Sequence, residues 1–257
     1  MLKSIGADAA RETQVSEADQ STPQACACCG GARHGSGFAL SRRRFLASSL
    51  AGAAASAVAA ASPASAQSAL LPEAALNALL AGNRRFVEQR LSSFDEDLGI
   101  LKQNTAGKQE PFAAVLSCAD SRVPVELIFD QNIGRLFVTR VAGNIATPEM
   151  IASLEYGAAV LGTKAILVLG HANCGAVKAA MAGKEVPGQI SGLYAFLRPA
   201  IAPAGNDLEA AIKANAKFQA DLLATASPVL AGLTQQGRLK IAAGYYALDT
   251  GKVTLLD

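Results

Sequence analysis

The sequence has no tryptophan, few aromatic residues and no large excess of charge of either sign. Its 257 residues include 23 Lys and Arg against 21 Asp and Glu, and aromatic residues make up 5% of the chain. Residues 1–66 hold six of the basic and four of the acidic residues, which leaves 17 of each in residues 67–257. Residues 67–257 therefore carry no basic stripe or acidic tail of the kind that would indicate nucleic acid or a charged membrane surface as a partner.

Histidine and cysteine are scarce in the body of the chain. Beyond residue 66 there are two cysteines, Cys118 and Cys174, and one histidine, His171. Apolar residues make up 51% of the sequence, which is typical of a globular domain with a core of Ala, Leu, Val and Ile. Since no internal repeat or low-complexity linker follows residue 70, we predict one domain over residues 67–257.

The first 66 residues have the composition of a targeting segment. The stretch "SRRRFLA" (41–47) places twin arginines before Phe-Leu, and an Ala-rich run follows at 47–62. Residues 64–66, Ala-Ser-Ala, supply small residues for cleavage. The pattern predicts a twin-arginine-type signal peptide cleaved after Ala66, and therefore a periplasmic or otherwise exported protein. A membrane anchor is the less favoured alternative, because a spanning helix needs about 20 strongly apolar residues.

A second cysteine group precedes the signal. The segment "CACCGGARH" contains Cys26, Cys28, Cys29 and His34. Crowded thiols beside a histidine could bind a metal, but a disordered leader is the favoured interpretation. Residues 1–66 are therefore excluded from the predicted fold.

Strand-like and helix-like segments alternate through the remainder of the chain. Short apolar runs predict strands at 111–118, 135–144, 164–171, 238–248 and 251–256. Helical patterns cover 71–90, 95–104, 147–162, 174–183, and two or three segments between 190 and 236, one of them capped by Asn206. The alternation predicts an α/β fold with a mostly parallel central sheet flanked by helices, and an antiparallel C-terminal edge strand.

Two of the predicted strands end in residues that can bind metal. Cys118 follows the first strand, His171 ends the third, and Cys174 lies three residues further on. In parallel sheets, sites form beyond the carboxyl ends of strands, so these side chains are expected to meet. Two sulfurs and one imidazole suit zinc, and three protein ligands leave a fourth position open, as a catalytic site needs. The start of a helix at Cys174 would favour its thiolate.

A disulfide between Cys118 and Cys174 is the alternative, because two cysteines of an exported protein can form one in an oxidising compartment. It would leave His171 and the charged pair Asp120 and Arg122 without a role. That pair could also be an ordinary surface ion pair. The zinc interpretation is favoured, and a non-catalytic binding or scaffold module with an oxidised pair stays open as the competing class.

The motifs together resemble those of the beta-class carbonic anhydrases, whose pattern is Cys-x-Asp-x-Arg followed by His-x-x-Cys. Here these are "CADSRVP" (118–124) and "HANCGA" (171–176). The similarity extends over roughly residues 70–257 through "ELIFD" (126–130), "LFVTRVAGN" (136–144), "EYGAAVLG" (155–162) and "YYALDTGKV" (245–253).

The resemblance implies reversible hydration of carbon dioxide to bicarbonate and a proton by a zinc-bound hydroxide. It implies one zinc per chain, bound by Cys118, His171 and Cys174, in a homodimer or higher assembly of dimers. Asp120 would accept the hydrogen bond of the hydroxide, while Arg122 would pair with Asp120 and keep it ionised. Carbonyl sulfide or carbon disulfide stays open as an alternative substrate.

The resemblance also assigns a pocket for carbon dioxide, lined by Gln109, Phe137, Ala142 and Tyr156. Gln109 would reach across the dimer interface, and Ala142 replaces a bulkier valine often found there. Core packing is the alternative role for Phe137 and Tyr156. The absence of tryptophan favours the subtype whose site is open near neutral pH, with Asp120 off the metal.

Overall fold

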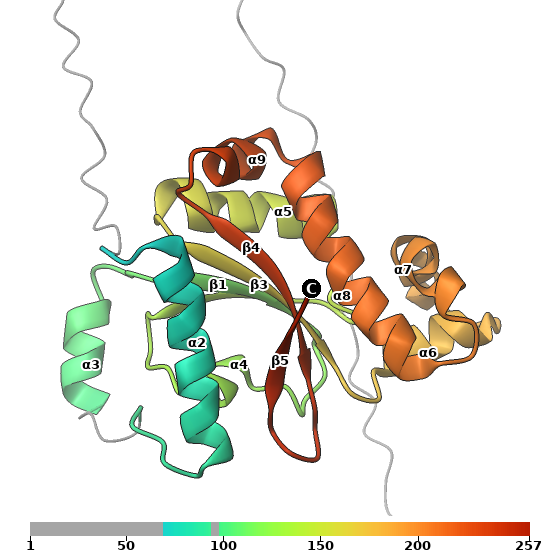
Figure 1. Cartoon of the computed structure of the whole chain (residues 1–257), viewed down its shortest axis with the longest axis horizontal. Helices are drawn as coiled ribbons and strands as arrows, with labels where there is room; N and C mark the ends of the chain where they lie inside the picture. The colour runs from blue at the N-terminus through green and yellow to red at the C-terminus, as the bar shows by residue number, and fades with distance from the viewer. Residues whose placement is uncertain (1–68, 94–97) are drawn as a thin grey trace, which may run out of the picture. The chain divides into compact units, whose positions relative to one another are not determined.

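A five-stranded sheet runs through the computed structural model, which describes residues 69–93 and 98–257 (Figure 1). The strand order is β2-β1-β3-β4-β5. The first four strands are parallel, and β5 pairs antiparallel with β4 at one edge. The strands are β1 (Ala113–Ser117), β2 (Leu136–Arg140), β3 (Ala165–His171), β4 (Lys240–Tyr246) and β5 (Val253–Leu256). The predicted α/β fold and its antiparallel edge strand are confirmed.

The strand order reverses between β1 and β3. From β1 the chain moves outward to β2 and then returns past β1 to form β3 on its other side. Ser117 at the end of β1 pairs with Leu169 of β3, so the residues that follow both strands emerge at the same edge of the sheet. Ligand sites of open α/β sheets form at such a switch point. Cys118 and His171 lie there.

Helices cover both faces of the sheet. On one face α2 (Pro72–Val87) and the short α4 (Val125–Ile128) share a buried cluster with strand residues such as Val115 and Leu167. On the other, α5 (Pro148–Glu155), α8 (Leu208–Ala226) and α9 (Pro228–Gln235) pack with Leu116 and Val168. Alternate residues of β1 and β3 thus face opposite clusters, which is why both strands read as continuous apolar runs.

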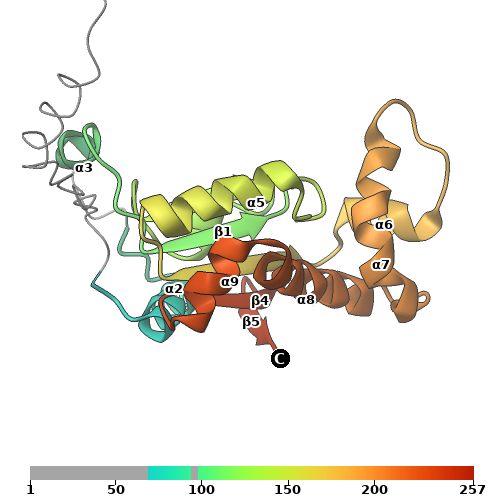
Figure 2. The same ribbon diagram turned by 90° about the horizontal axis from the view of Figure 1, so that it is seen from above.

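The remaining helices lie beyond the two ends of the sheet (Figures 1 and 2). At one end, α6 (Gly175–Ala182) and α7 (Tyr194–Ile201) form a third buried cluster that includes Cys118 and Cys174. At the other end lies α3 (Leu98–Thr105). Short 3₁₀ turns occupy Ile190–Leu193 and Ala202–Ala204, and a π-helical turn, Tyr156–Val160, extends α5.

Two local expectations are corrected. The residue that caps α8 is Asp207, whose side chain accepts a hydrogen bond from the backbone N–H of Ala210, and not Asn206. Both residue types cap helices well, so the two adjacent positions were indistinguishable from sequence. The four-residue α4 was also not anticipated, because one turn of helix leaves no periodic pattern to detect.

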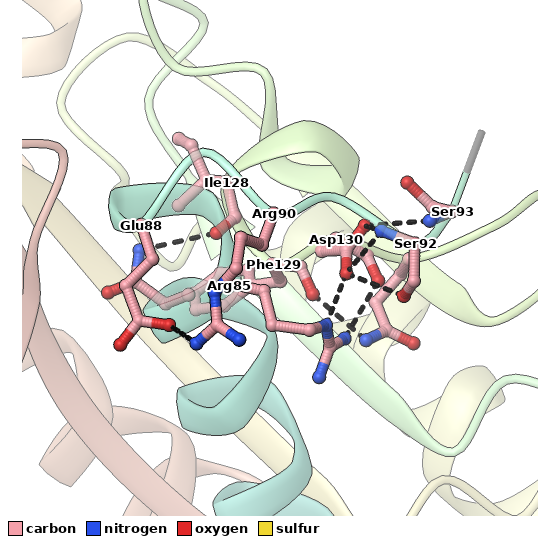
Figure 3. Close-up of polar contacts among 10 residues, drawn as sticks. Arg85, Glu88, Arg90, Ser92, Ser93, Ile128, Phe129 and Asp130 are labelled. Carbon is pink, nitrogen blue, oxygen red and sulfur yellow. Dashed lines mark hydrogen bonds and ion pairs between the residues drawn. The ribbon is translucent and has the colours of Figure 1, made fainter. Parts of the chain in front are cut away.

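The buried carboxylate of Asp130 ties the end of α2 to the connection between β1 and β2 (Figure 3). Its side chain is 0% exposed and accepts hydrogen bonds from Arg85, from the hydroxyl and N–H of Ser92, and from the N–H of Ser93. Burial by itself would raise the pKa of Asp130, but these hydrogen bonds outweigh it and hold that pKa well below its usual range.

Replacing Asp130 with asparagine is expected to lower the free energy of unfolding at pH 7 by about 2–3 kcal/mol, since Arg85 loses its buried partner. Because the pKa of Asp130 is lower in the folded protein than in the unfolded chain, the ionised carboxylate stabilises the fold at pH values above its unfolded-state pKa. This stabilisation is lost as the pH falls from there towards the folded-state pKa. The difference between the two proteins should therefore shrink below about pH 4. Urea unfolding at pH 7 and at acidic pH measures both.

The matched control is Glu88→Gln, which removes the exposed Glu88–Arg90 pair also drawn in Figure 3. Both side chains of that pair are solvated, so the expected change is below about 0.5 kcal/mol. Equal losses from Asp130→Asn at pH 7 and in acid would contradict the assigned role of the carboxylate.

All described residues belong to one compact unit. Within that part of the chain, no helix is both long and apolar enough to cross a membrane. The predicted signal peptide, its cleavage after Ala66, and the group formed by Cys26, Cys28, Cys29 and His34 lie outside the described residues.

Candidate metal centre

Three metal-binding side chains meet at the carboxyl ends of β1 and β3. One donor atom from each of Cys118, His171 and Cys174 lies within 4.8 Å of the other two. The three residues are buried, at 4%, 0% and 0% exposure. Cys118 follows β1, His171 is the last residue of β3, and Cys174 is the N-cap of α6. The structure therefore brings together the three side chains that the sequence suggested.

The hydrogen bonding of His171 suits a metal ligand. Its Nδ1 is 2.9 Å from the carbonyl oxygen of Ala172, so Nδ1 carries the ring proton and donates it. Its Nε2 is buried and has no hydrogen-bond partner in the structure. Burying a polar atom without a partner costs free energy, and a metal ion at Nε2 would remove that cost. This orphaned nitrogen beside two sulfurs fits a Cys-His-Cys site.

Both cysteines are free thiols in the structure, not the disulfide held open as an alternative. The hydrogen bond from the Cys174 thiol is the main reason that the pKa of Cys118 falls far below its ordinary value, and the N–H of Gly143, 3.3 Å from Cys118 Sγ, adds to the effect. The same shared proton, together with burial, raises the pKa of Cys174. The two thiols therefore share one proton, and the pair begins to ionise at lower pH than a free cysteine.

Asp120 lies beside the three donors and is held by Arg122. The Nε and Nη2 atoms of Arg122 donate to the two carboxylate oxygens at 2.9 and 2.8 Å, and its backbone N–H donates to Oδ1 at 2.9 Å. These bonds, the side-chain ones above all, hold the pKa of Asp120 well below its usual range. Oδ2 is 3.9 Å from Nε2 of His171. The pair is thus a bidentate fork next to the donor set, and not an isolated surface pair.

Arg140 is a site residue that sequence reasoning undervalued. From the end of β2 its Nε donates to the carbonyl of Cys118 at 3.0 Å, and its Nη2 donates to the carbonyl of Asp120 at 2.6 Å. Arg140 therefore clamps the backbone on which both residues are carried. A single basic residue at a strand end gives no sequence signal of this role.

The four predicted pocket residues do not gather around the donors within one chain. Phe137 and Tyr156 contact each other, with ring centroids 6.2 Å apart, but Phe137 pairs with Ala114, roughly 13 Å along β1 from Cys118. Tyr156 is 48% exposed. Gln109 is exposed and precedes β1, at the opposite end of the strand from Cys118. Ala142 alone lies close, next to Gly143.

Comparisons with known proteins agree with this site. The carbonic anhydrase family model matches residues 113–253. Carbonic anhydrase 2 of Mycobacterium tuberculosis is 34% identical over 198 residues, which cover 72% of this chain and 93% of that protein. The carbonic anhydrase of Pseudomonas aeruginosa is 34% identical over 174 residues, 61% of this chain and 78% of that protein.

Solved structures lead to the same class. The beta-carbonic anhydrase of Coccomyxa is 26% identical, with a TM-score of 0.56 over 70% of this chain and 86% of that one. CafA of Aspergillus fumigatus is 25% identical, with a TM-score of 0.58 over 71% of this chain and 90% of that one. The chain belongs to the carbonic anhydrase family and, by fold and donor set, to its beta class.

Proposed function

We propose that this chain hydrates carbon dioxide reversibly at a zinc ion held by Cys118, His171 and Cys174. The observation that carries the proposal is the convergence of three buried donors, with Nε2 of His171 left unpaired beside two free thiols. Two sulfurs and one nitrogen match the ligand preference of zinc, and three protein ligands leave one position for a small molecule. Membership of the carbonic anhydrase family supplies the reaction.

Each residue of the site has a part in this chemistry. Zinc, when bound, supplies the Lewis acidity that lowers the pKa of a coordinated water to about 7. The carboxylate of Asp120 is ionised, and its Oδ2 lies 3.9 Å from Nε2 of His171. Asp120 is therefore placed to accept a hydrogen bond from the attacking water and to orient that water. Arg122 binds both carboxylate oxygens, so Asp120 keeps its charge and stays off the donor set. We therefore expect an open site at neutral pH.

The test is a stopped-flow hydration assay with a pH indicator on the purified full chain, before and after loading with zinc. The zinc-loaded protein is expected to hydrate carbon dioxide far above the uncatalysed rate. A zinc-loaded protein that leaves the uncatalysed rate unchanged would overturn the proposal.

We further propose that the chain works as a homodimer or a higher assembly of dimers. Phe137, Tyr156 and Gln109 lie away from the donors of their own chain, and the exposed Tyr156 and Val160 leave apolar surface beside them. A second copy would complete the pocket with these side chains. Light scattering is expected to give the mass of at least two chains. The mass of one chain at assay concentration, with full activity, would contradict this.

Export through the twin-arginine route is proposed from the motif at residues 41–47 and the small residues before Gln67. In a host with that route, the exported protein is expected to begin at Gln67. The paired change of Arg42 and Arg43 to lysine should hold the protein inside the cell. Unchanged export of this variant would argue against the proposal.

A further inference from the structure

The loop that follows β2 contacts the metal centre through its backbone. The N–H of Gly143 lies 3.3 Å from Sγ of Cys118. Gly143 and Asn144 both have left-handed backbone conformations, with φ of +81° and +44°. A Cβ added to Gly143 would lie 3.2 Å from Leu197, so the backbone is closely packed as well as unusually turned. The direction in which the Gly143 N–H points therefore depends on the hydrogen bonds that fix the loop after β2 to the rest of the protein.

Two buried polar side chains of α8 hold it. Asn215 Nδ2 donates to the carbonyl of Gly143 at 2.9 Å. Gln219, one turn later, donates from Nε2 to Asn215 Oδ1 at 3.1 Å, and its Oε1 accepts from the N–H of Ala146 at 2.9 Å. Both ends of the loop are thus fixed to one helix. Gly143 itself is bound on both sides, through its carbonyl to Asn215 and through its N–H to Cys118.

Burying the amide groups of Asn215 and Gln219 among apolar side chains costs free energy unless their hydrogen bonds are made. Asn215 and Gln219 are both 0% exposed, and on α8 they share the buried face with Ala211, Ile212 and Ala216. Buried amides are tolerated only when their hydrogen bonds are made. Gln219 completes its bonds by donating to the carbonyl of Phe196 at 3.0 Å. The two amides thus bond to each other, to the backbone of the loop after β2, and to one backbone carbonyl of α7.

We propose that Asn215, supported by Gln219, is a positioning residue of the metal centre. By holding the carbonyl of Gly143 it keeps the N–H of that residue on Cys118 Sγ, and the remaining lone pairs of the sulfur would be available to a metal ion. The inference rests on the proposed function, since it concerns zinc bound by Cys118, His171 and Cys174. Groups that orient metal ligands in this way are typically worth about 10- to 100-fold in metal affinity.

The test compares Asn215→Ala with Asn83→Ala in the full chain. Asn83 is a matched control: it is also a buried asparagine whose Nδ2 donates to backbone carbonyls, of Ile128 and Gly251, but it lies on α2 and faces the β4–β5 hairpin. Zinc affinity is measured by competition with a chelator. Cobalt-substituted protein then reports the sulfur directly, through its thiolate-to-cobalt absorption band.

Asn215→Ala is expected to weaken zinc binding by about 10-fold or more and to shift the cobalt band. Asn83→Ala should change neither, although it lowers stability. Wild-type affinity and an unshifted band in Asn215→Ala would overturn the inference, as would equal losses in both variants. If Asn215→Ala does not fold, Gln219→Met decides: weaker zinc binding supports the inference, and unchanged binding overturns it. A wild-type chain that binds no zinc would instead defeat the proposed function.

Discussion

Replacing Cys118 with serine is expected to remove bound zinc and carbon dioxide hydration together. Cys118 supplies one of the three buried donors, and serine cannot supply an anionic ligand at neutral pH. His171 and Cys174 would then be left as two ligands for a metal that takes four. Because the reaction depends on water activated by the metal, hydration should fall at least about 1,000-fold. Metal analysis and stopped-flow assays on the same preparation measure both losses.

The neighbouring Ser117→Ala provides the control for Cys118→Ser. Ser117 is equally buried, and its hydroxyl makes only a long contact of 3.4 Å with the carbonyl of Cys118. This variant should keep about one zinc per chain and near-normal hydration. The account would be contradicted if Cys118→Ser bound zinc with wild-type affinity, or if it lost the metal and kept its activity.

Asp120→Ala is expected to separate metal binding from catalysis. The carboxylate lies beside the three donors and is not one of them, so the zinc content should stay near one per chain. Hydration should fall by about 10²- to 10⁴-fold, the usual contribution of a positioned acid or base group. The zinc content of the variant is determined before its stopped-flow rates are compared with those of the wild type. Loss of the metal in Asp120→Ala would place the carboxylate in the ligand set.

Arg122→Ala should change the acid side of the rate profile. The hydrogen bonds of Arg122 are the main cause of the lowered pKa of Asp120, so their removal raises that pKa towards its ordinary value near 3.9. The variant should therefore lose activity at higher pH than the wild type as the medium is acidified. Arg198→Ala, which removes an exposed arginine stacked on Tyr194, is the control and should not move the profile. Superimposable profiles for Arg122→Ala and the wild type would contradict the assigned role.

The central strands and the donor set were predictable from sequence for a physical reason. β1 and β3 are buried on both faces, so each appears as a short continuous apolar run. Parallel strands carry their carboxyl ends to one edge, so the sequence alone predicts Cys118 beside His171. The three-residue step from His171 to Cys174 spans only the turn into α6.

The parts that could not be predicted depend on tertiary contacts between distant segments. The role of Arg140 is not readable from the sequence, because its bonds to the carbonyls after β1 exist only once β2 lies beside that strand. Asn215 and Gln219 lie on the buried face of α8, and the contacts that satisfy their amides come from the loop after β2 and from α7. Their spacing of four residues on the face shared with Ile212 was the available signal. The pocket residues were named by resemblance, and one chain does not assemble them.

The most direct measurement is the rate of carbon dioxide hydration as zinc is removed from the full chain with a chelator and then restored. Our account predicts that activity falls in proportion to the zinc content, that both described thiols become reactive as the metal leaves, and that one zinc per chain restores the full rate. Full activity in zinc-free protein, or restored zinc without activity, would contradict the assignment of the reaction to Cys118, His171 and Cys174.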